Sequence, residues 1–186
     1  MNFELNENQL MIQQMVRDFA AKEIKPHLID WDRDEHFPVD VMKKLGELGL
    51  LGIFVPEEYG GSGFTYDEYV TALIELGKVC GGIGLSVAAH NSLCTGHIYY
   101  HGSEEQKKKY LPKLASGEFI GAWGLTEPNT GSDAMRMKTT AVKDGNEWVI
   151  NGAKNWITHG LSGDVAVVLV RTGELLDSRG ITAFIV

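Results

Sequence analysis

The chain has few cysteines and few basic residues. Only two of its 186 residues are cysteines, Cys80 and Cys94, and no CxxC pattern joins them. We therefore expect buried free thiols in a reducing compartment rather than a disulfide. The formal net charge of −8 argues against a nucleic-acid partner, because a nucleic-acid-binding surface needs a basic field. The one basic run, residues 107–109, covers a single turn and is typical of a solvated helix face.

Long uninterrupted apolar runs are also absent. The most apolar stretch, residues 81–102, is interrupted by His90, Asn91 and His97. It falls short of the roughly 18 apolar residues that indicate a membrane span, so it predicts a buried core helix. The N-terminus has no basic segment followed by an apolar one, and no secretory signal is visible. These features predict a soluble, cytoplasmic protein with no membrane partner.

Apolar residues recur at helical spacing in the first half of the chain. The face of the first helix is formed by Ile12, Met15, Val16, Phe19 and Ala20. Three helix starts carry a capping-box pattern: Asn6 with Gln9, Thr65 with Glu68, and Ser103 with Gln106. Another helix is expected to start near Pro38 and end before Gly49, and Pro112 is expected to kink or shorten the last one.

After Gly117 the pattern changes to short apolar runs separated by turn residues. Strands are expected in the runs 119–125, 139–152, 154–160, 164–172 and 180–186. Asp144-Gly145 predicts a hairpin turn and Asn151-Gly152 a second one. The sequence thus predicts an α+β protein, with an all-α domain over 1–118 and an antiparallel, barrel-like β-domain over 119–186. The last strand ends at Val186 with no cap, so we expect the β-domain to be incomplete and the chain to be a fragment.

The longest turn-rich stretch is "GLTEPNTGSDA", residues 124–134, which follows an apolar strand. Gly131 allows close approach of a ligand or another backbone, and Thr126 and Ser132 offer hydroxyls. Exposed amides in such a loop can face an anion or the heteroatoms of a ring. The alternative is a long β-connection in which Asp133 caps the next segment.

A second stretch, "NWITHG", covers residues 155–160. On a strand, Trp156 and Thr158 would point to the same face, because they stand two residues apart. An indole beside a hydroxyl suits a flat heteroaromatic ligand. The alternative is an ordinary core tryptophan.

The sequence resembles the acyl-CoA dehydrogenase family over its whole length. The motifs that carry the resemblance are "GLTEPNTGSDA", "NGAKNWITHG", "PEEYGGSG" and "HGSEEQKKKYLPKLASGE". The family fold has an N-terminal helical domain, a middle β-domain and a C-terminal four-helix bundle. This chain resembles the first domain and most of the second, and the bundle is absent from it.

The resemblance implies that the long turn helps to hold FAD. Segment 123–126 would run along the flavin ring, and segment 156–158 would cover one flavin face. The turn at Gly131 and Ser132 would lie where the flavin phosphate meets the pantetheine arm of acyl-CoA, so Ser132 would also contact substrate. The implied cofactor residues are Trp123, Leu125, Thr126, Gly131, Ser132, Trp156, Ile157 and Thr158. Thr130 and Arg136 depart from the family, which has smaller residues there; Arg136 would contact CoA phosphate or be a surface cation.

The implied reaction is α,β-desaturation of an acyl-CoA thioester, with electrons passed to an electron-transfer flavoprotein. The family's glutamate base lies in the bundle, so no catalytic residue is assigned here, and Glu127 is expected to bind backbone amides. The histidines show no metal-site spacing, and none is assigned to a metal. The full-length protein would be a homotetramer. The isolated chain is expected to bind FAD weakly or not at all, and to have no turnover.

Two other functions stay open at this point. An acyl-CoA oxidase shares the fold and passes electrons to oxygen. A non-catalytic binding module of the same fold is the second alternative, which the intact "LTEP", "GSD" and "WIT" elements disfavour. The sequence does not predict the preferred acyl chain.

Overall fold

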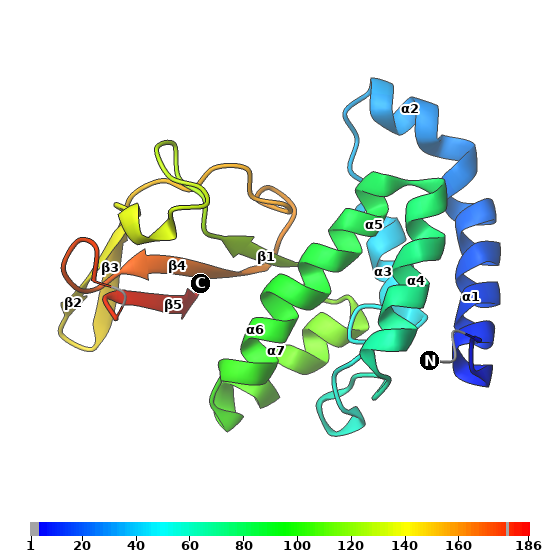
Figure 1. Cartoon of the computed structure of the whole chain (residues 1–186), viewed down its shortest axis with the longest axis horizontal. Helices are drawn as coiled ribbons and strands as arrows, with labels where there is room; N and C mark the ends of the chain where they lie inside the picture. Colours follow the sequence, from blue (N-terminus) through cyan, green and yellow to red (C-terminus); the bar gives the residue numbers. More distant parts are fainter. Residues whose placement is uncertain (1–3, 178) are drawn as a thin grey trace. The chain divides into compact units, whose positions relative to one another are not determined.

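The computed structural model describes residues 4–177 and 179–186. The chain divides into a helical unit that ends at Ile120 and a β unit from Gly121 to Val186 (Figure 1). The order of the two units, helices first and a sheet second, confirms the predicted α+β class. Each unit is described below by itself.

The helical unit contains seven α-helices and four short 3₁₀- or π-helical turns among the described residues. They are α1 (Glu7–Phe19), η1 (Ala20–Ile24), η2 (Lys25–His27), α2 (Leu28–Arg33), α3 (Val39–Glu47), η3 (Glu57–Tyr59), α4 (Tyr66–Val79), α5 (Gly81–Ala88), η4 (Ala89–Thr95), α6 (Gly96–His101) and α7 (Glu104–Ser116). All three predicted capping boxes form, at the starts of α1, α4 and α7. Pro112 does not shorten its helix, since α7 continues to Ser116.

The apolar run at residues 81–102 forms α5, η4 and α6, which follow one another without a break. Two of its three interrupting polar residues, His90 and Asn91, are buried, and His97 is half-buried. His90 Nε2 lies 3.2 Å from the Leu51 carbonyl oxygen and 3.1 Å from that of Leu114. Asn91 donates to the Leu50 carbonyl at 2.8 Å. These contacts satisfy polar groups inside the core and confirm the prediction of a buried helix. Among the described residues, no helix combines the length and hydropathy that a transmembrane span requires.

The β unit is built around one mixed sheet. Its elements are β1 (Gly121–Gly124), η5 (Ala134–Arg136), β2 (Thr140–Asp144), β3 (Glu147–Asn151), β4 (Val165–Arg171) and β5 (Ile181–Ile185). The strand order is β1-β4-β2-β3, and β5 pairs with β4. The β2–β3 and β4–β5 pairs are antiparallel as expected, but β4 runs parallel to β1 and β2. The sheet is therefore mixed and not purely antiparallel as predicted. Parallel strands need a long crossover connection, and the segment with the β2–β3 hairpin supplies it between β1 and β4.

One of the two predicted hairpins forms. Gly145 adopts a φ of 60° in the β2–β3 turn, as the Asp-Gly signal predicts. The prediction of a second hairpin at Asn151-Gly152 is wrong, because β3 ends at Asn151 and an irregular segment follows. Gly152 serves a close approach instead: a Cβ on it would lie 2.3 Å from Thr139 Oγ1.

Candidate functional site

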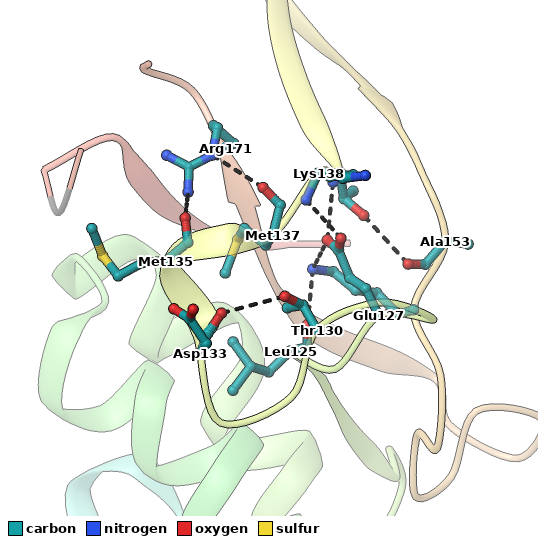
Figure 2. A network of polar contacts seen from close by, with 11 residues as sticks. Leu125, Glu127, Thr130, Asp133, Met135, Met137, Lys138, Ala153 and Arg171 are labelled. Carbon is teal, nitrogen blue, oxygen red and sulfur yellow. Dashed lines mark hydrogen bonds and ion pairs between the residues drawn. The ribbon is translucent and has the colours of Figure 1, made fainter. Parts of the chain in front are cut away.

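The loop that follows β1 is folded onto itself by its own backbone. Glu127 and Thr130 exchange two backbone hydrogen bonds, of 2.9 and 3.2 Å, across a tight turn. The Thr130 hydroxyl donates to the Asp133 carbonyl at 3.3 Å, and η5 follows directly (Figure 2). The loop therefore has a defined shape before any ligand is considered.

The Glu127 side chain is the polar centre of this loop. Its carboxylate accepts hydrogen bonds from the amides of Lys138 at 2.6 Å and Thr139 at 2.9 Å, and from Lys154 Nζ at 2.8 Å (Figure 2). Burial raises the pKa of Glu127, but these donors together outweigh it and lower the pKa to about 2. The carboxylate is thus ionised at neutral pH, and the prediction that Glu127 binds backbone amides is confirmed.

Lys154 joins this loop to the segment that carries "NWITHG". Its ammonium donates to the Leu125 carbonyl at 3.0 Å as well as to Glu127. One residue later, the Asn155 amide donates to the Thr126 carbonyl at 2.8 Å. Two segments that lie about 30 residues apart in the sequence are therefore in direct contact.

The segment at residues 154–160 is not a strand, and the predicted common strand face for Trp156 and Thr158 is wrong. Trp156 and His159 have left-handed φ angles of 60° and 63°, which interrupt an extended backbone. His159 is held by its ring, whose Nδ1 donates to the Gly121 carbonyl at 2.9 Å, while burial lowers its pKa. Two non-glycine residues in this conformation within one short loop mark stored backbone strain, which is common at ligand sites.

Arg171, at the end of β4, holds the far side of the long loop. It is 5% exposed, and its guanidinium donates to the carbonyls of Met135 at 2.5 Å and Met137 at 3.1 Å (Figure 2). It also donates to the Glu174 carbonyl at 2.6 Å. Sequence reasoning missed this residue and Lys154. A single Arg at the end of an apolar strand was the available signal for Arg171, because a buried guanidinium requires acceptors.

The eight sequence-predicted site residues lie on the segments that these contacts organise. Trp123 is in β1, Leu125 and Thr126 follow it, and all three are half-buried. Gly131 and Ser132 are exposed in the loop, and a Cβ on Gly131 would meet no atom within 4 Å. Trp156 is 90% exposed, while Ile157 and Thr158 are half-buried.

Several of these residues have polar groups available to a ligand. Within residues 4–177 and 179–186, the hydroxyls of Thr126, Ser132 and Thr158 form no hydrogen bond to another residue. The same holds for the amides of Gly131 and Ser132. Hydroxyls, free amides and an exposed indole are the groups that bind a planar, anionic heteroaromatic molecule.

Two family profiles match the chain: acyl-CoA dehydrogenase, N-terminal domain, over residues 6–118, and acyl-CoA dehydrogenase, middle domain, over residues 122–186. The chain belongs to the acyl-CoA dehydrogenase family. A probable acyl-CoA dehydrogenase of Bacillus subtilis is 49% identical over 186 residues, which are 100% of this chain and 49% of that protein.

Solved structures agree with this assignment. A chain from structural work on the electron transferring flavoprotein of Acidaminococcus fermentans matches with a TM-score of 0.97 and 43% identity, over 100% of this chain and 49% of that one. A glutaryl-CoA dehydrogenase from Mycobacterium smegmatis in complex with FADH2 matches with a TM-score of 0.90 and 38% identity, over 98% of this chain and 46% of that one. The chain therefore spans about half the length of the acyl-CoA dehydrogenase relatives it matches.

Thr130 and Arg136, which we predicted to depart from the family pattern, both contact Asp133. The Thr130 hydroxyl donates to the Asp133 carbonyl, and Arg136 Nε donates to the Asp133 carboxylate at 2.8 Å. Both Arg136 and Asp133 are exposed, so this ion pair contributes little to stability. A contact of Arg136 with CoA phosphate stays a prediction.

A pocket of about 460 Å³ lies in the β unit beside the candidate site. Its wall includes Lys154, Ile157, His159 and Asp164. Of the eight predicted cofactor residues, only Ile157 lines it, and Trp156 and Thr126 lie outside it. Among the parts of the chain that the structure describes, no group of three His, Cys, Asp or Glu side chains is placed to hold a metal ion.

Proposed function

We propose that this chain carries the flavin-contacting part of an FAD-dependent acyl-CoA dehydrogenase that catalyses α,β-desaturation of an acyl-CoA thioester. The observation that supports it most strongly is the direct contact between the two motif segments, through Lys154 and through the Asn155–Thr126 hydrogen bond. A similarity of two unconnected motifs would be weaker support, because a cofactor site requires its residues to be brought together.

The residues present fit FAD by the chemistry of their donors. The Thr126 and Thr158 hydroxyls would bond to the ring system, and the exposed Trp156 indole would pack on it. The amides of Gly131 and Ser132 would face a phosphate, with Ser132 also meeting the substrate arm. Bound FAD would supply a hydride acceptor, and the protein residues would supply binding, orientation and exclusion of water.

A catalytic base is not assigned to this chain. Glu127 is unsuited to that task, because three donors occupy its carboxylate and hold its pKa at about 2. A general base in such a reaction needs a raised pKa and access to the substrate. We propose that the base belongs to the half of the family fold that this chain does not span, so that the chain alone does not turn over substrate. Of the two outcomes expected from the sequence, weak binding of FAD or none, we propose weak binding, because the two motif segments are already in contact.

Titration of the chain with FAD tests this proposal. We expect saturable quenching of flavin fluorescence, and about fivefold weaker binding in Trp156→Ala, since one aromatic contact contributes roughly 1 kcal/mol. Trp148→Ala is the matched control, because Trp148 is an exposed tryptophan of β3 and is not assigned to the cofactor. Equal weakening by both substitutions, or no binding at millimolar FAD, would contradict the proposal.

The partners follow from the same proposal. An acyl-CoA would be the substrate, and an electron-transfer flavoprotein would accept the electrons; the similarity to a chain from work on such a flavoprotein supports this. The full-length protein is proposed to be a cytoplasmic homotetramer. Reduction of the full-length protein by an acyl-CoA, followed by reoxidation with an electron-transfer flavoprotein but not with oxygen, would separate a dehydrogenase from an oxidase.

A further inference from the structure

The two motif segments that meet in the candidate site are not joined by sheet pairing. Residues 125–127 and 153–155 lie outside the regular strands. Among the described residues, three hydrogen bonds connect these segments: Asn155 to Thr126, Lys154 to the Leu125 carbonyl, and Lys154 to the Glu127 carboxylate. Lys154 therefore makes two of the three connections.

We propose that Lys154 is a positioning residue that fixes the two flavin-contacting segments against each other before the cofactor binds. This inference rests on the proposed function, and it assigns a role to a residue that would not itself touch the flavin ring.

The Lys154 side chain is only 10% exposed and that of Glu127 is 5% exposed. A buried ammonium is costly unless it is paired, so a lysine in this position is held by its acceptors rather than by solvent. Glu127 and the Leu125 carbonyl are those acceptors, and they flank Thr126 in the chain. The ammonium thereby fixes the backbone on both sides of a predicted flavin contact.

The path of the lysine side chain is defined by a glycine. A Cβ placed on Gly124, the last residue of β1, would lie 3.4 Å from Lys154 Cγ, so the lysine stem passes beside the end of this strand. Apolar packing of the stem with a polar head at its end is the usual arrangement for a partly buried lysine. The stem also borders the pocket that Ile157 lines. Lys154 is thus fixed at its stem and at its head.

Glu127 extends the effect of Lys154 to the far end of the loop. The same carboxylate accepts from the Lys138 and Thr139 amides, just after η5. The exposed turn with Gly131 and Ser132 lies between these two anchored ends. Movement of Lys154 would therefore change the position of the segment with Trp156 and of both ends of the loop. A site arranged in advance binds more tightly, because less conformational freedom is lost when the ligand enters.

Amide hydrogen exchange on the 186-residue chain tests this role without a cofactor. Lys154→Met keeps the length of the stem and removes the charge, whereas Lys154→Arg keeps the charge. We expect Lys154→Met to speed exchange at the Asn155 and Thr139 amides at least about tenfold, as local opening becomes easier. Exchange at Val168 in β4 should not change, and Lys154→Arg should restore part of the protection. Lys143→Met, on exposed β2, is the matched control.

The same variants, titrated with FAD, give the second readout. We expect FAD to bind about tenfold more weakly to Lys154→Met, which corresponds to about 1.4 kcal/mol. Lys143→Met should bind FAD with wild-type affinity. Unchanged exchange at Asn155 and Thr139 in Lys154→Met, or unchanged FAD affinity, would overturn the positioning role. Loss of protection at Val168 in Lys154→Met would mean that the whole sheet is destabilised. In that case Lys154→Gln is measured in its place, because glutamine keeps a donor for the Leu125 carbonyl but carries no charge.

These readouts separate the two proposals. If the wild-type chain shows no FAD binding, the proposed function fails, and the exchange data alone decide whether Lys154 holds the segments together. If FAD binds and only the exchange result is negative, the proposed function stands and the role of Lys154 falls.

Discussion

Replacing Glu127 with glutamine should destabilise the β unit strongly. The substitution removes a buried negative charge that three donors share, and puts an amide NH2 group in place of one of the two acceptor oxygens. A pKa lowered from 4.5 to about 2 corresponds to about 3 kcal/mol at neutral pH. Removing one partner of a buried ion pair generally costs about 3–5 kcal/mol. We therefore expect Glu127→Gln to lower the free energy of unfolding by about 3 kcal/mol at pH 7.

The same lowered pKa also predicts how the stability of the chain changes with pH. Because folding lowers the pKa of Glu127, its contribution is fully present above about pH 4.5 and is lost as the pH falls toward 2. The wild-type chain should lose this stability over that interval, whereas Glu127→Gln has no carboxylate to titrate there. The difference between the two proteins should shrink to about 1 kcal/mol at pH 3.

Urea unfolding at pH 7 and pH 3, followed by tryptophan fluorescence, measures both effects. Three of the four tryptophans, Trp123, Trp148 and Trp156, lie in the β unit, so the signal reports mainly on that unit. With a typical m-value of about 2 kcal/mol/M, the midpoint at pH 7 should fall by about 1.5 M. Glu147→Gln, an exposed acid of β3, is the control and should change little. A loss below about 1 kcal/mol at pH 7, or a difference that does not shrink at pH 3, would refute the reasoning.

Three further predictions follow from other contacts. Gly152→Ala should destabilise the β unit by at least about 2 kcal/mol in urea unfolding, because the new Cβ would lie 2.3 Å from Thr139 Oγ1; an unchanged midpoint would contradict this. Trp156→Ala should leave the free energy of unfolding within about 0.5 kcal/mol of the wild-type value, because the side chain is 90% exposed; a large loss of stability would show that this indole packs in the core. Arg171→Met should cost about 3 kcal/mol, since the carbonyls of Met135, Met137 and Glu174 lose a buried, charged donor, and a loss below about 1 kcal/mol would refute that role.

Local signals in the sequence predicted the helical unit well. Each capping box depends on residues three positions apart, and each forms at the expected helix start. The buried run at 81–102 was also predictable, because its polar residues are too frequent for a membrane span. Of the two effects predicted for Pro112, shortening of the helix is wrong, since α7 continues through it to Ser116.

Pairing in the β unit depends on contacts that a local pattern does not contain. The Asp144-Gly145 turn was predictable because it is set by adjacent residues. The parallel pairing of β4 with β1 and β2 was not, because it joins strands distant in the sequence. The segment at Trp156 resembles a strand in composition, yet it contains two left-handed residues, Trp156 and His159. It is held by distant contacts, from Asn155 to Thr126 and from His159 to Gly121.

The candidate site was predicted in part for the same reason. Motif resemblance indicated the residues that would face a cofactor, and the structure brings their two segments together. Lys154, which joins these segments, carried no local signal, because its role is defined by distant acceptors. Arg171 carried a weak one, as a lone arginine at the end of an apolar strand, but the sequence did not show which carbonyls it would bind. The eight cofactor contacts themselves stay predictions.

The most direct test of the central claim is a titration of the ¹⁵N-labelled chain with FAD, followed by amide chemical shifts. The account predicts saturable shifts at both segments together, at Thr126, Gly131 and Ser132 on one side and at Trp156 and Thr158 on the other. Shifts confined to one segment, shifts located in the helical unit, or no shifts at millimolar FAD would contradict it.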